Sequence, residues 1–378
     1  MISQFNFPTV IRFGAGAVSE LGPYLVSQGL KRPLVSTDPL VASLPFFAKI
    51  LAQLEAQGLK PVVFKDIHKN PVKSDVLAGG DVYEREGCDS IVGIGGGAAL
   101  DVSRAIALRI NHREDLFVYD DLIGGDVYVT NPIPHFVTIP TTSGTGSEVG
   151  RSAIISEDDT HRKRILFAPS LLAKRVFADP ELTYDLPPAV TAATGMDALT
   201  HNMEAYIAKN YHPMADGIAL EGIKLIAKSL VKAVKNPDPQ SRADMMLASL
   251  MGAVAFQKGL GVVHSLAHPL STLLDMHHGL ANALMIPYGM EFNIAGQEER
   301  FAAMAHALGL ETLSGEAVID HLFSLNDQIG IPRKLSSQGV NAAHLEQLAD
   351  LALADFCHPN NPKPVSREDF LSLYEQAL

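Results

Sequence analysis

Short apolar segments alternate with longer helical patterns through the first half of this 378-residue chain. Five of these segments are rich in valine, isoleucine, phenylalanine or threonine: PLVSTD (33–38), PVVFKDI (61–67), SIVGIGGG (90–97), HFVTIPTT (135–142) and KRVFADPEL (174–182). Strands that alternate with helices form βαβ units, in which neighbouring strands are mainly parallel. The first half is therefore predicted to be α/β, with a Rossmann-like parallel sheet.

The pattern changes after Pro187. Three long segments then carry apolar residues at helical spacing, without runs of β-branched residues: 189–209, 214–234 and 242–257. We place the boundary at about 180–188, where several prolines occur, because helices tend not to continue across prolines. We expect two domains, an α/β dinucleotide-binding domain over residues 1–184 and an all-α metal-binding and catalytic domain over residues 185–378.

Composition narrows the class of protein. A formal net charge of −12 disfavours nucleic acid or an anionic membrane as the main partner. The two cysteines, Cys88 and Cys357, stand far apart and outside any CxxC pattern, which fits a reducing cytoplasm better than a disulfide framework. No segment approaches the roughly 18 apolar residues of a membrane span, and the first residues do not resemble a signal peptide. We expect a cytoplasmic enzyme that acts on a small molecule.

A glycine-rich turn follows the apolar segment 90–94. Gly93-x-Gly95-x-x-Ala98 can be read as a GxGxxA pattern, in which glycines let the backbone approach a pyrophosphate at a helix N-terminus. The same glycines could simply form a tight turn between strand and helix. The acidic residue that usually follows such glycines by about 20 positions has no counterpart at a strand end here.

Asp38, at the end of an earlier predicted strand, is the better candidate to accept hydrogen bonds from a ribose 2′-hydroxyl. Its charge would repel a 2′-phosphate, so the expected cofactor is NAD in preference to NADP. An equally weighted alternative is that Asp38 caps a turn or helix before Pro39. A second glycine-rich and hydroxyl-rich segment, PTTSGTGSE (140–148), could close over phosphates or a nicotinamide, or could be a flexible surface loop.

Histidines and one aspartate at helical spacing predict a metal site in the second half. Asp197 and His201 are four residues apart, as are His264 and His268, and each spacing places both side chains on one helix face. Imidazole nitrogens together with one carboxylate suit Fe²⁺ or Zn²⁺ better than Ca²⁺ or Mg²⁺. The alternative is that these histidines are hydrogen-bonded core or surface residues.

His277 and His278 could complete the site only if the chain reverses direction. In one straight helix His264 and His278 would be roughly 20 Å apart, beyond the reach of one ion. Pro269 disfavours a continuous helix, and the polar segment DMHH (275–278) before Gly279 supplies a plausible loop, so we expect the chain to reverse between Pro269 and Gly279. Neighbouring histidines point in different directions, and the spacing does not decide which of the two joins the site.

Over nearly its whole length the chain resembles the iron-containing (group III) alcohol dehydrogenase family, related to glycerol dehydrogenase and dehydroquinate synthase. The resemblance is carried by GGGAALD, TIPTTSGTGSE, ATGMDALTHNMEAY and GLGVVHSLAHPLSTLLDMHHGLANALMIPYGMEFN. It implies a dehydroquinate synthase-like fold, an α/β nucleotide domain followed by a helical domain, with the catalytic site between them. It also implies a homodimer.

The resemblance assigns individual roles. It makes Asp197, His201, His264 and His278 the metal ligands, and it makes His268 a catalytic or proton-handling group beside the substrate. The cofactor contacts that it implies are Asp38, Asn70, Gly95, Gly96, Gly97, Ala98, Asp101, Thr141, Thr142, Ser143, Thr145 and Lys163. His277 receives no role.

The implied activity is NAD-linked hydride transfer between an alcohol carbon and nicotinamide, with the substrate oxygen on Fe²⁺ or, alternatively, Zn²⁺. One alternative is a metal- and NAD-dependent lyase of the dehydroquinate synthase type. Another is a dehydrogenase for an acidic hydroxy acid or semialdehyde, because Lys258 stands near the metal-binding segments and its ammonium could pair with an acidic group.

Overall fold

The structure, a computed structural model, describes residues 5–378. By their internal contacts the residues fall into two compact units. The sheet unit comprises Pro8–Thr142 and Ser147–Thr183, and the helical unit comprises residues 5–7, Ser143–Gly146 and Tyr184–Leu378. The helical unit therefore includes residues 143–146, a short segment from the first half of the chain. The domain ranges 1–184 and 185–378 stay a prediction.

Six parallel strands form the sheet of the sheet unit. Their order is β1 (Val10–Phe13), β8 (Arg175–Ala178), β5 (His135–Pro140), β4 (Ser90–Gly95), β2 (Pro33–Ser36) and β3 (Val62–Phe64). Every pairing in this sheet is parallel. The α/β prediction is therefore confirmed, because each of the five apolar segments contains a strand of this sheet.

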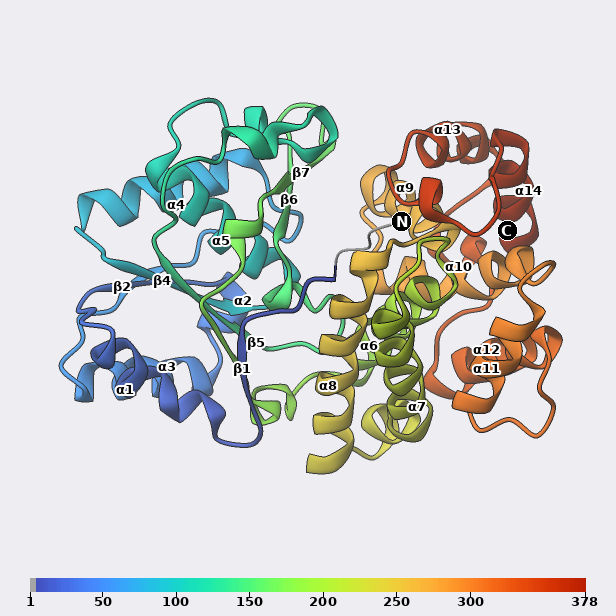
Figure 1. The fold of residues 1–378 in the computed structure, drawn as a ribbon, viewed down its shortest axis with the longest axis horizontal. Helices are drawn as coiled ribbons and strands as arrows, with labels where there is room; N and C mark the ends of the chain where they lie inside the picture. The colour runs from blue at the N-terminus through green and yellow to red at the C-terminus, as the bar shows by residue number, and fades with distance from the viewer. Residues whose placement is uncertain (1–4) are drawn as a thin grey trace. The chain divides into compact units, whose positions relative to one another are not determined.

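Helices cover both faces of the sheet. Successive residues of a strand point to opposite faces, so Val35 and Val92 pack with α1 (Leu21–Ser27) and α3 (Pro45–Ala56). Their neighbours Leu34 and Ile91 belong to the other apolar cluster, with α4 (Lys73–Arg85) and α5 (Gly97–Asn111). Figure 1 shows α1 and α3 on one side of the strands and α4 and α5 on the other.

The chain changes direction within the sheet between β2 and β4. From β2 it passes through α2 (Pro39–Ala42) and α3 to β3 at one edge, and then returns through α4 to β4 on the other side of β2. Loops at such a switch point separate at the carboxyl ends of the strands and leave a crevice there, where α/β proteins bind ligands. Asp38 and Gly95 both lie at this position.

An antiparallel hairpin that the sequence pattern did not predict follows the segment 140–148. It consists of β6 (Ser152–Ser156) and β7 (Lys163–Phe167). Arg104, fully buried on α5, donates to Asp101 Oδ1, Ser147 Oγ and the Ser152 carbonyl oxygen at 3.2, 3.0 and 2.7 Å. These bonds fasten α5 to the start of the hairpin.

The helical unit contains nine α-helices within the described part of the chain. They are α6 (Pro188–Ile207), α7 (Pro213–Lys235), α8 (Pro239–Ala255), α9 (Val262–Leu274), α10 (His278–Asn293), α11 (Glu298–Ala307), α12 (Gly315–Ile329), α13 (Ala342–Leu353) and α14 (Arg367–Ala377). A proline opens each of α6, α7 and α8, where its missing N–H would have no helical partner in any case. The prediction of an all-helical second half is confirmed.

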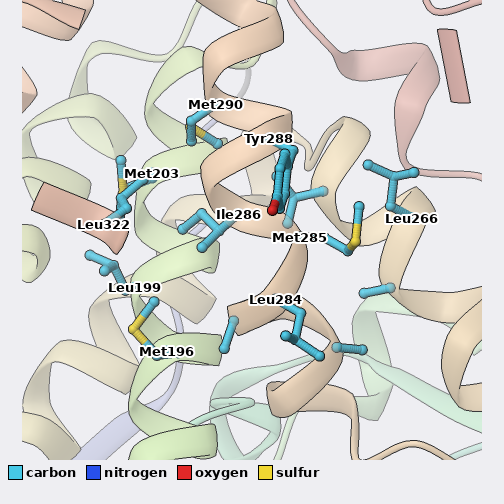
Figure 2. Close-up of a cluster of buried hydrophobic side chains, with 14 of the residues drawn as sticks. Met196, Leu199, Met203, Leu266, Leu284, Met285, Ile286, Tyr288, Met290 and Leu322 are labelled. Carbon is cyan, nitrogen blue, oxygen red and sulfur yellow. The ribbon is translucent and has the colours of Figure 1, made fainter. Parts of the chain in front are cut away.

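The core of this unit is built around α6 and α10. Met196, Leu199 and Met203 of α6 meet side chains of α10, including Ile286 and Met290, in the apolar cluster drawn in Figure 2. In residues 191–207 of α6 every residue is buried, polar ones included. Polar side chains on this helix must therefore find partners inside the protein.

The chain reverses before His278, within the polar segment 275–278 where the sequence suggested a loop. Helix α9 continues through Pro269 to Leu274, and the reversal follows at Asp275, which has a positive φ of 51°. The predicted reversal is confirmed, although Pro269 itself does not end the helix. Pro269 is itself buried, so tertiary packing of α9 outweighs the cost of the proline, and an aspartate tolerates the left-handed conformation that ends the helix.

In residues 5–378, no single helix has both the length and the apolar character of a membrane span. The sharply bent pair Pro239–Lys258 and Val262–Leu274 meets these criteria only when its two parts are taken together, across an angle of 109°.

Glu148 is a buried carboxyl group in the sheet unit and predicts a pH-dependent stability. Burial raises its pKa to about 7, against an ordinary 4.5, and the opposing effect of the Arg104 charge is smaller. Between these two values the unfolded chain releases a proton that the native protein retains. Stability present below pH 4.5 is therefore lost as the pH rises to about 7, by on the order of 3 kcal/mol.

Glu148→Gln, which is isosteric with the protonated acid, should abolish this loss. The free energy of unfolding can be measured with urea at pH 4.5, 6 and 8. That of the variant, relative to that of the wild type, should rise by on the order of 3 kcal/mol across this range. Glu55→Gln, an exposed position on α3, is the control and should follow the wild type. If the free energies of unfolding of wild type and Glu148→Gln change with pH in the same way, the prediction is wrong.

Candidate metal centre

Asp197 and His201 come from the middle of α6. They lie one turn apart on the same helix face and are 2% and 5% exposed. Both residues therefore present polar side chains inside the helical unit rather than to water. Such groups require compensation by hydrogen bonds or by a bound ion.

His264 and His278 reach the same point from two further helices. His264 lies in the first turn of α9, and His278 is the first residue of α10, immediately after the chain reversal. The Nε2 atoms of His201, His264 and His278 lie 3.9, 4.0 and 3.4 Å from Asp197 Oδ1. One ligand atom from each of the four residues falls within 4.8 Å of all the others.

This arrangement separates the two neighbouring histidines. His278 belongs to the group of four, whereas His277 occupies the N-cap position of α10 and is not part of that group. The structure thus brings together the same four residues that the family resemblance had selected. Their role as metal ligands stays a prediction.

Two of the imidazoles are oriented through their other ring nitrogen. Glu204, on α6 and fully buried, lies with Oε2 2.5 Å from His264 Nδ1. Its carboxylate also accepts from the backbone N–H groups of Val263 and His264 at 2.7 and 3.3 Å, so it caps α9 as well. Because the carboxylate can only accept, Nδ1 carries the proton and Nε2 is left with its lone pair.

His201 is oriented by a backbone carbonyl. Its Nδ1 lies 3.3 Å from the carbonyl oxygen of Gly144. Gly144 can come so close because a Cβ there would lie 2.8 Å from the Cβ of Thr194 on α6. The segment Ser143–Gly146, predicted from sequence as a cofactor loop, thus also packs on α6, which carries two of the candidate metal ligands.

The pKa values of these histidines reflect their surroundings. Burial lowers the pKa of His201 to about 4, although Asp197 acts in the opposite direction. Burial alone would also lower the pKa of His264, but the bond to Glu204 outweighs it and the pKa is raised.

The donor set fits a divalent metal ion. Three imidazole nitrogens and one carboxylate oxygen converge, and at least two of the rings have their second nitrogen engaged within the protein. Asn282 Nδ2 donates to Asp197 Oδ1 at 2.8 Å and lies 3.2 to 3.3 Å from Nε2 of His278 and His264, so these nitrogens face the same point as the carboxylate oxygen. Nitrogen and oxygen donors in this ratio are typical of Fe²⁺ and Zn²⁺ sites.

Sequence analysis missed Glu204, Gly144 and Asn282. Glu204 was detectable, because it stands seven residues after Asp197 and three after His201 and so shares their helix face. Asn282 similarly follows His278 by four residues. Gly144 left no such signal, since its carbonyl reaches His201 only through tertiary packing.

His268 lies beside the four candidate ligands. Its ring is nearly parallel to that of His278, with centroids 5.3 Å apart, and its Nδ1 is 2.7 Å from Asp355 Oδ2. Burial would raise the pKa of Asp355, but the charge of His268 and three hydrogen bonds hold it at about 2. Asp355 is therefore ionised at neutral pH, and sequence analysis did not single it out.

On the sheet unit, several predicted cofactor residues meet at the carboxyl ends of β2, β4 and β5. Asp38 Oδ1 accepts from the backbone N–H of Val41 at 2.9 Å, so the alternative reading of Asp38 as a helix cap is confirmed. A Cβ on Gly95, whose φ is +150°, would lie 3.4 Å from Asp38 Oδ2, and Gly95 accepts from Thr141 N at 3.0 Å. The ribose contact stays a prediction.

The remaining cofactor candidates have different surroundings. Gly96 caps α5, Gly97 and Ala98 begin it, and Thr142 lies against Gly96. The Asp101 carboxylate already accepts from Ser147 Oγ, Arg104 and the Ile154 N–H, which gives it a structural role in the sheet unit. Asn70 lies in the loop after β3, Lys163 opens β7, and Ser143 and Thr145 belong to the helical unit. Their cofactor contacts stay predictions.

Lys258 does not have the role that we hypothesised. Its side chain is completely buried, with Nζ 2.5 Å from Asp216 Oδ1 and 2.7 Å from the Tyr206 carbonyl oxygen. Arg300 binds the same aspartate and the same carbonyl. The ammonium is therefore committed to an internal ion pair, and the hypothesis that it pairs with an acidic substrate was wrong.

Both units of the chain match models of a known protein family. Residues 8–180 match the model described as "Iron-containing alcohol dehydrogenase", and residues 191–378 match "Fe-containing alcohol dehydrogenase family, C-terminal". The chain belongs to the iron-containing alcohol dehydrogenase family. It is accordingly an oxidoreductase of a family of NAD-dependent enzymes, as its sequence led us to expect.

Individual relatives of this family are similar over their full length. A 4-hydroxybutyrate dehydrogenase from Cupriavidus necator is 37% identical over 98% of each chain. The crystal structure of a 1,3-propanediol oxidoreductase is 35% identical, covers 100% of both chains and superposes with a TM-score of 0.95. A sulfoacetaldehyde reductase from Bifidobacterium kashiwanohense, solved in complex with NAD⁺, is 26% identical over 100% of this chain and 99% of its own, with a TM-score of 0.89.

The orientation of His264 by Glu204 predicts a specific loss of metal affinity. Glu204→Gln keeps the shape of the side chain but removes the charge that fixes the protonated Nδ1. Substituting such a partner of a metal ligand typically weakens metal binding about 10- to 100-fold. Titration of the metal-free protein with Zn²⁺ by calorimetry should show this decrease.

Glu221→Gln, on the exposed face of α7, provides the matched control and should bind Zn²⁺ as tightly as the wild type does. If Glu204→Gln folds and binds Zn²⁺ with unchanged affinity, then Glu204 does not orient a ligand.

Proposed function

We propose that this chain is a metal-dependent, NAD-linked alcohol dehydrogenase and aldehyde reductase, with Asp197, His201, His264 and His278 as the ligands of its divalent ion. The observation that carries the proposal is the convergence of these four donors within 4.8 Å of one another. The ion is Fe²⁺, with Zn²⁺ as the alternative. When bound, it would polarise the alcohol or carbonyl oxygen as a Lewis acid, while NAD would accept or return the hydride.

The protein's own residues have distinct tasks in this proposal. Asp197 contributes the only negative charge among the four ligands, and the three neutral imidazoles leave most of the ion's charge for the substrate. Glu204 and the Gly144 carbonyl hold two of the rings in place. His268, which stacks on His278, takes up the proton that the hydroxyl group releases when an alcohol is oxidised and returns it when an aldehyde is reduced.

The dinucleotide is proposed to bind at the carboxyl ends of β2, β4 and β5. The direction change between β2 and β4 and the N-terminus of α5 favour a phosphate-containing ligand there. Asp38 supports NAD in preference to NADP, because its Oδ2 lies beside Gly95 while only Oδ1 is used in capping α2. The other proposed contacts are Asn70, Gly95, Gly96, Gly97, Ala98, Asp101, Thr141, Thr142, Ser143, Thr145 and Lys163.

The substrate is proposed to be a small alcohol or aldehyde. A narrower candidate, a hydroxy acid or semialdehyde, is favoured by the names of two relatives, since 4-hydroxybutyrate and sulfoacetaldehyde both carry an anionic group. Lys258 cannot supply the matching cation, so any anion recognition must come from other residues. The relation to 1,3-propanediol oxidoreductase favours an uncharged diol instead.

We further propose a homodimer in the cytoplasm. Strand β1 lies at an edge of the sheet and exposes Val10 and Phe13 by 52% and 41%, which suits burial against a second copy. Both cysteines are buried free thiols, as expected in a reducing compartment.

The first test is metal replacement combined with a substrate screen. Chelated, metal-free protein should show no NAD reduction, and Fe²⁺ or Zn²⁺ should restore it with at least one alcohol, diol or hydroxy acid. Comparing kcat/KM for 4-hydroxybutyrate, 1,3-propanediol and butanol would identify the substrate class. Net accumulation of NADH also distinguishes a dehydrogenase from a lyase that regenerates its NAD in every turnover.

Variants test the ligand set itself. His264→Ala and His278→Ala should each lose both bound metal, measured by elemental analysis, and turnover. The control is His306→Ala, an exposed histidine on α11, which should retain both. Retention of metal and turnover in the first two variants would overturn the site assignment.

A further inference from the structure

We infer that Asp355 is a positioning residue, which holds His268 in one tautomer and one orientation, and that Ser265 in turn holds Asp355. The inference rests on the proposed function, in which His268 handles the substrate proton. It concerns a pair of residues outside the four candidate ligands.

The contact between Asp355 and His268 determines which ring nitrogen carries a proton. Asp355 Oδ2 lies 2.7 Å from His268 Nδ1, and an ionised carboxylate can only accept. Nδ1 must therefore be the donor. A neutral imidazole with a proton on Nδ1 leaves Nε2 as the nitrogen that can accept a proton from the substrate.

The carboxylate is itself held in place by two further donors, one of which is held by a third residue. Ser265 Oγ and the backbone N–H of Cys357 donate to Asp355 Oδ1 at 2.7 and 2.9 Å. The N–H of His358 donates to Ser265 Oγ at 2.9 Å, so the serine hydroxyl hydrogen is free to be directed at Asp355. Ser265 stands one helical turn before His268 on α9, which ties both ends of the network to one helix.

The plane of the His268 ring is fixed by packing. It contacts the ring of His278, at an interplanar angle of 19°, and that of Phe356, at 33°, with centroids 5.3 Å away in both cases. Stacking alone would allow the ring to flip by half a turn. The bond to Asp355 selects one of the two flipped states and so decides where Nε2 lies.

A second metal site is the alternative interpretation of this region, because His268, Asp355 and Cys357 also place ligand atoms within 4.8 Å of one another. The hydrogen bonds argue against it. Both carboxylate oxygens already accept from protein donors, and burial raises the pKa of the Cys357 thiol well above its ordinary value. A cysteine binds metal as the thiolate, so this cluster is a hydrogen-bonded network.

The direct test is the tautomer of His268. In ¹⁵N-histidine-labelled protein loaded with diamagnetic Zn²⁺, NMR distinguishes a protonated from an unprotonated ring nitrogen, and His268→Gln identifies the signals. Wild type should show a proton on Nδ1 and none on Nε2. In Asp355→Asn the amide can donate to Nδ1, so the pattern should reverse. The same pattern in both proteins would overturn the inference.

The kinetic test asks whether Asp355 acts through His268. Asp355→Asn should lower kcat about 10²- to 10⁴-fold, as loss of a correctly oriented proton acceptor does, while KM and metal content stay near wild type. When His268→Gln is already present, adding Asp355→Asn should cause no further loss. Independent, multiplicative losses would instead show a merely structural role.

Two further variants complete the design. Asp350→Asn on α13, an exposed aspartate paired with Arg367, is the matched control and should leave kcat unchanged. If Asp355→Asn does not fold, Ser265→Ala serves instead and should lower kcat about tenfold, again only when His268 is present. An unchanged kcat in a folded, metal-loaded variant overturns the inference.

Failure of the proposed function would be distinguishable from failure of the inference. If wild-type protein shows no NAD-linked turnover of any alcohol, the proposed function is wrong, yet the tautomer measurement still reports on Asp355. If wild type turns over and Asp355→Asn matches it, only the inference fails.

Discussion

The helical unit depends on one constraint: polar side chains buried in an apolar core must each find a partner. Asp197, His201 and His264 are between 1% and 5% exposed, in surroundings formed largely by methionine, leucine and alanine. Glu204 and the Gly144 carbonyl each engage one ring nitrogen and leave the opposite one facing a common point. The remaining lone pairs repel one another unless a cation lies among them. Binding of a divalent ion is thus the arrangement that satisfies the group electrostatically.

The same constraint explains why Glu204 both caps α9 and orients His264. Its carboxylate compensates the free N–H groups at the start of α9 and also orients His264 within that first turn. A helix end and a ligand are therefore positioned by one side chain. Any movement of α9 relative to α6 would disturb both, so the geometry of the site is as rigid as the packing of the two helices.

Much of this could be inferred from sequence because the relevant signals are local. The alternation of strands and helices predicted the parallel sheet, and i, i+4 spacing predicted the pairs on α6 and α9. Lys258 shows where local reasoning fails. Its position near the candidate metal ligands suggested a substrate contact, but its ion-pair partner Asp216 stands 42 residues before it. Arg300, which binds the same aspartate, stands 42 residues after it. No spacing rule reveals an ion pair that forms only when the segment Phe256–Lys258 packs on α7.

The sequence by itself determined the fold class, the family and the set of donors, because periodicity, turn-forming glycines and motif composition are properties of neighbouring residues. Tertiary structure decided which of those donors come together and how each side chain is oriented. It let α9 continue through Pro269 to Leu274, and it placed His278 rather than His277 with the other candidate ligands. It also brought Asp355 to His268 across 87 residues of chain. These outcomes depend on burial and on the direction of side chains in space, which the order of residues along the chain does not specify.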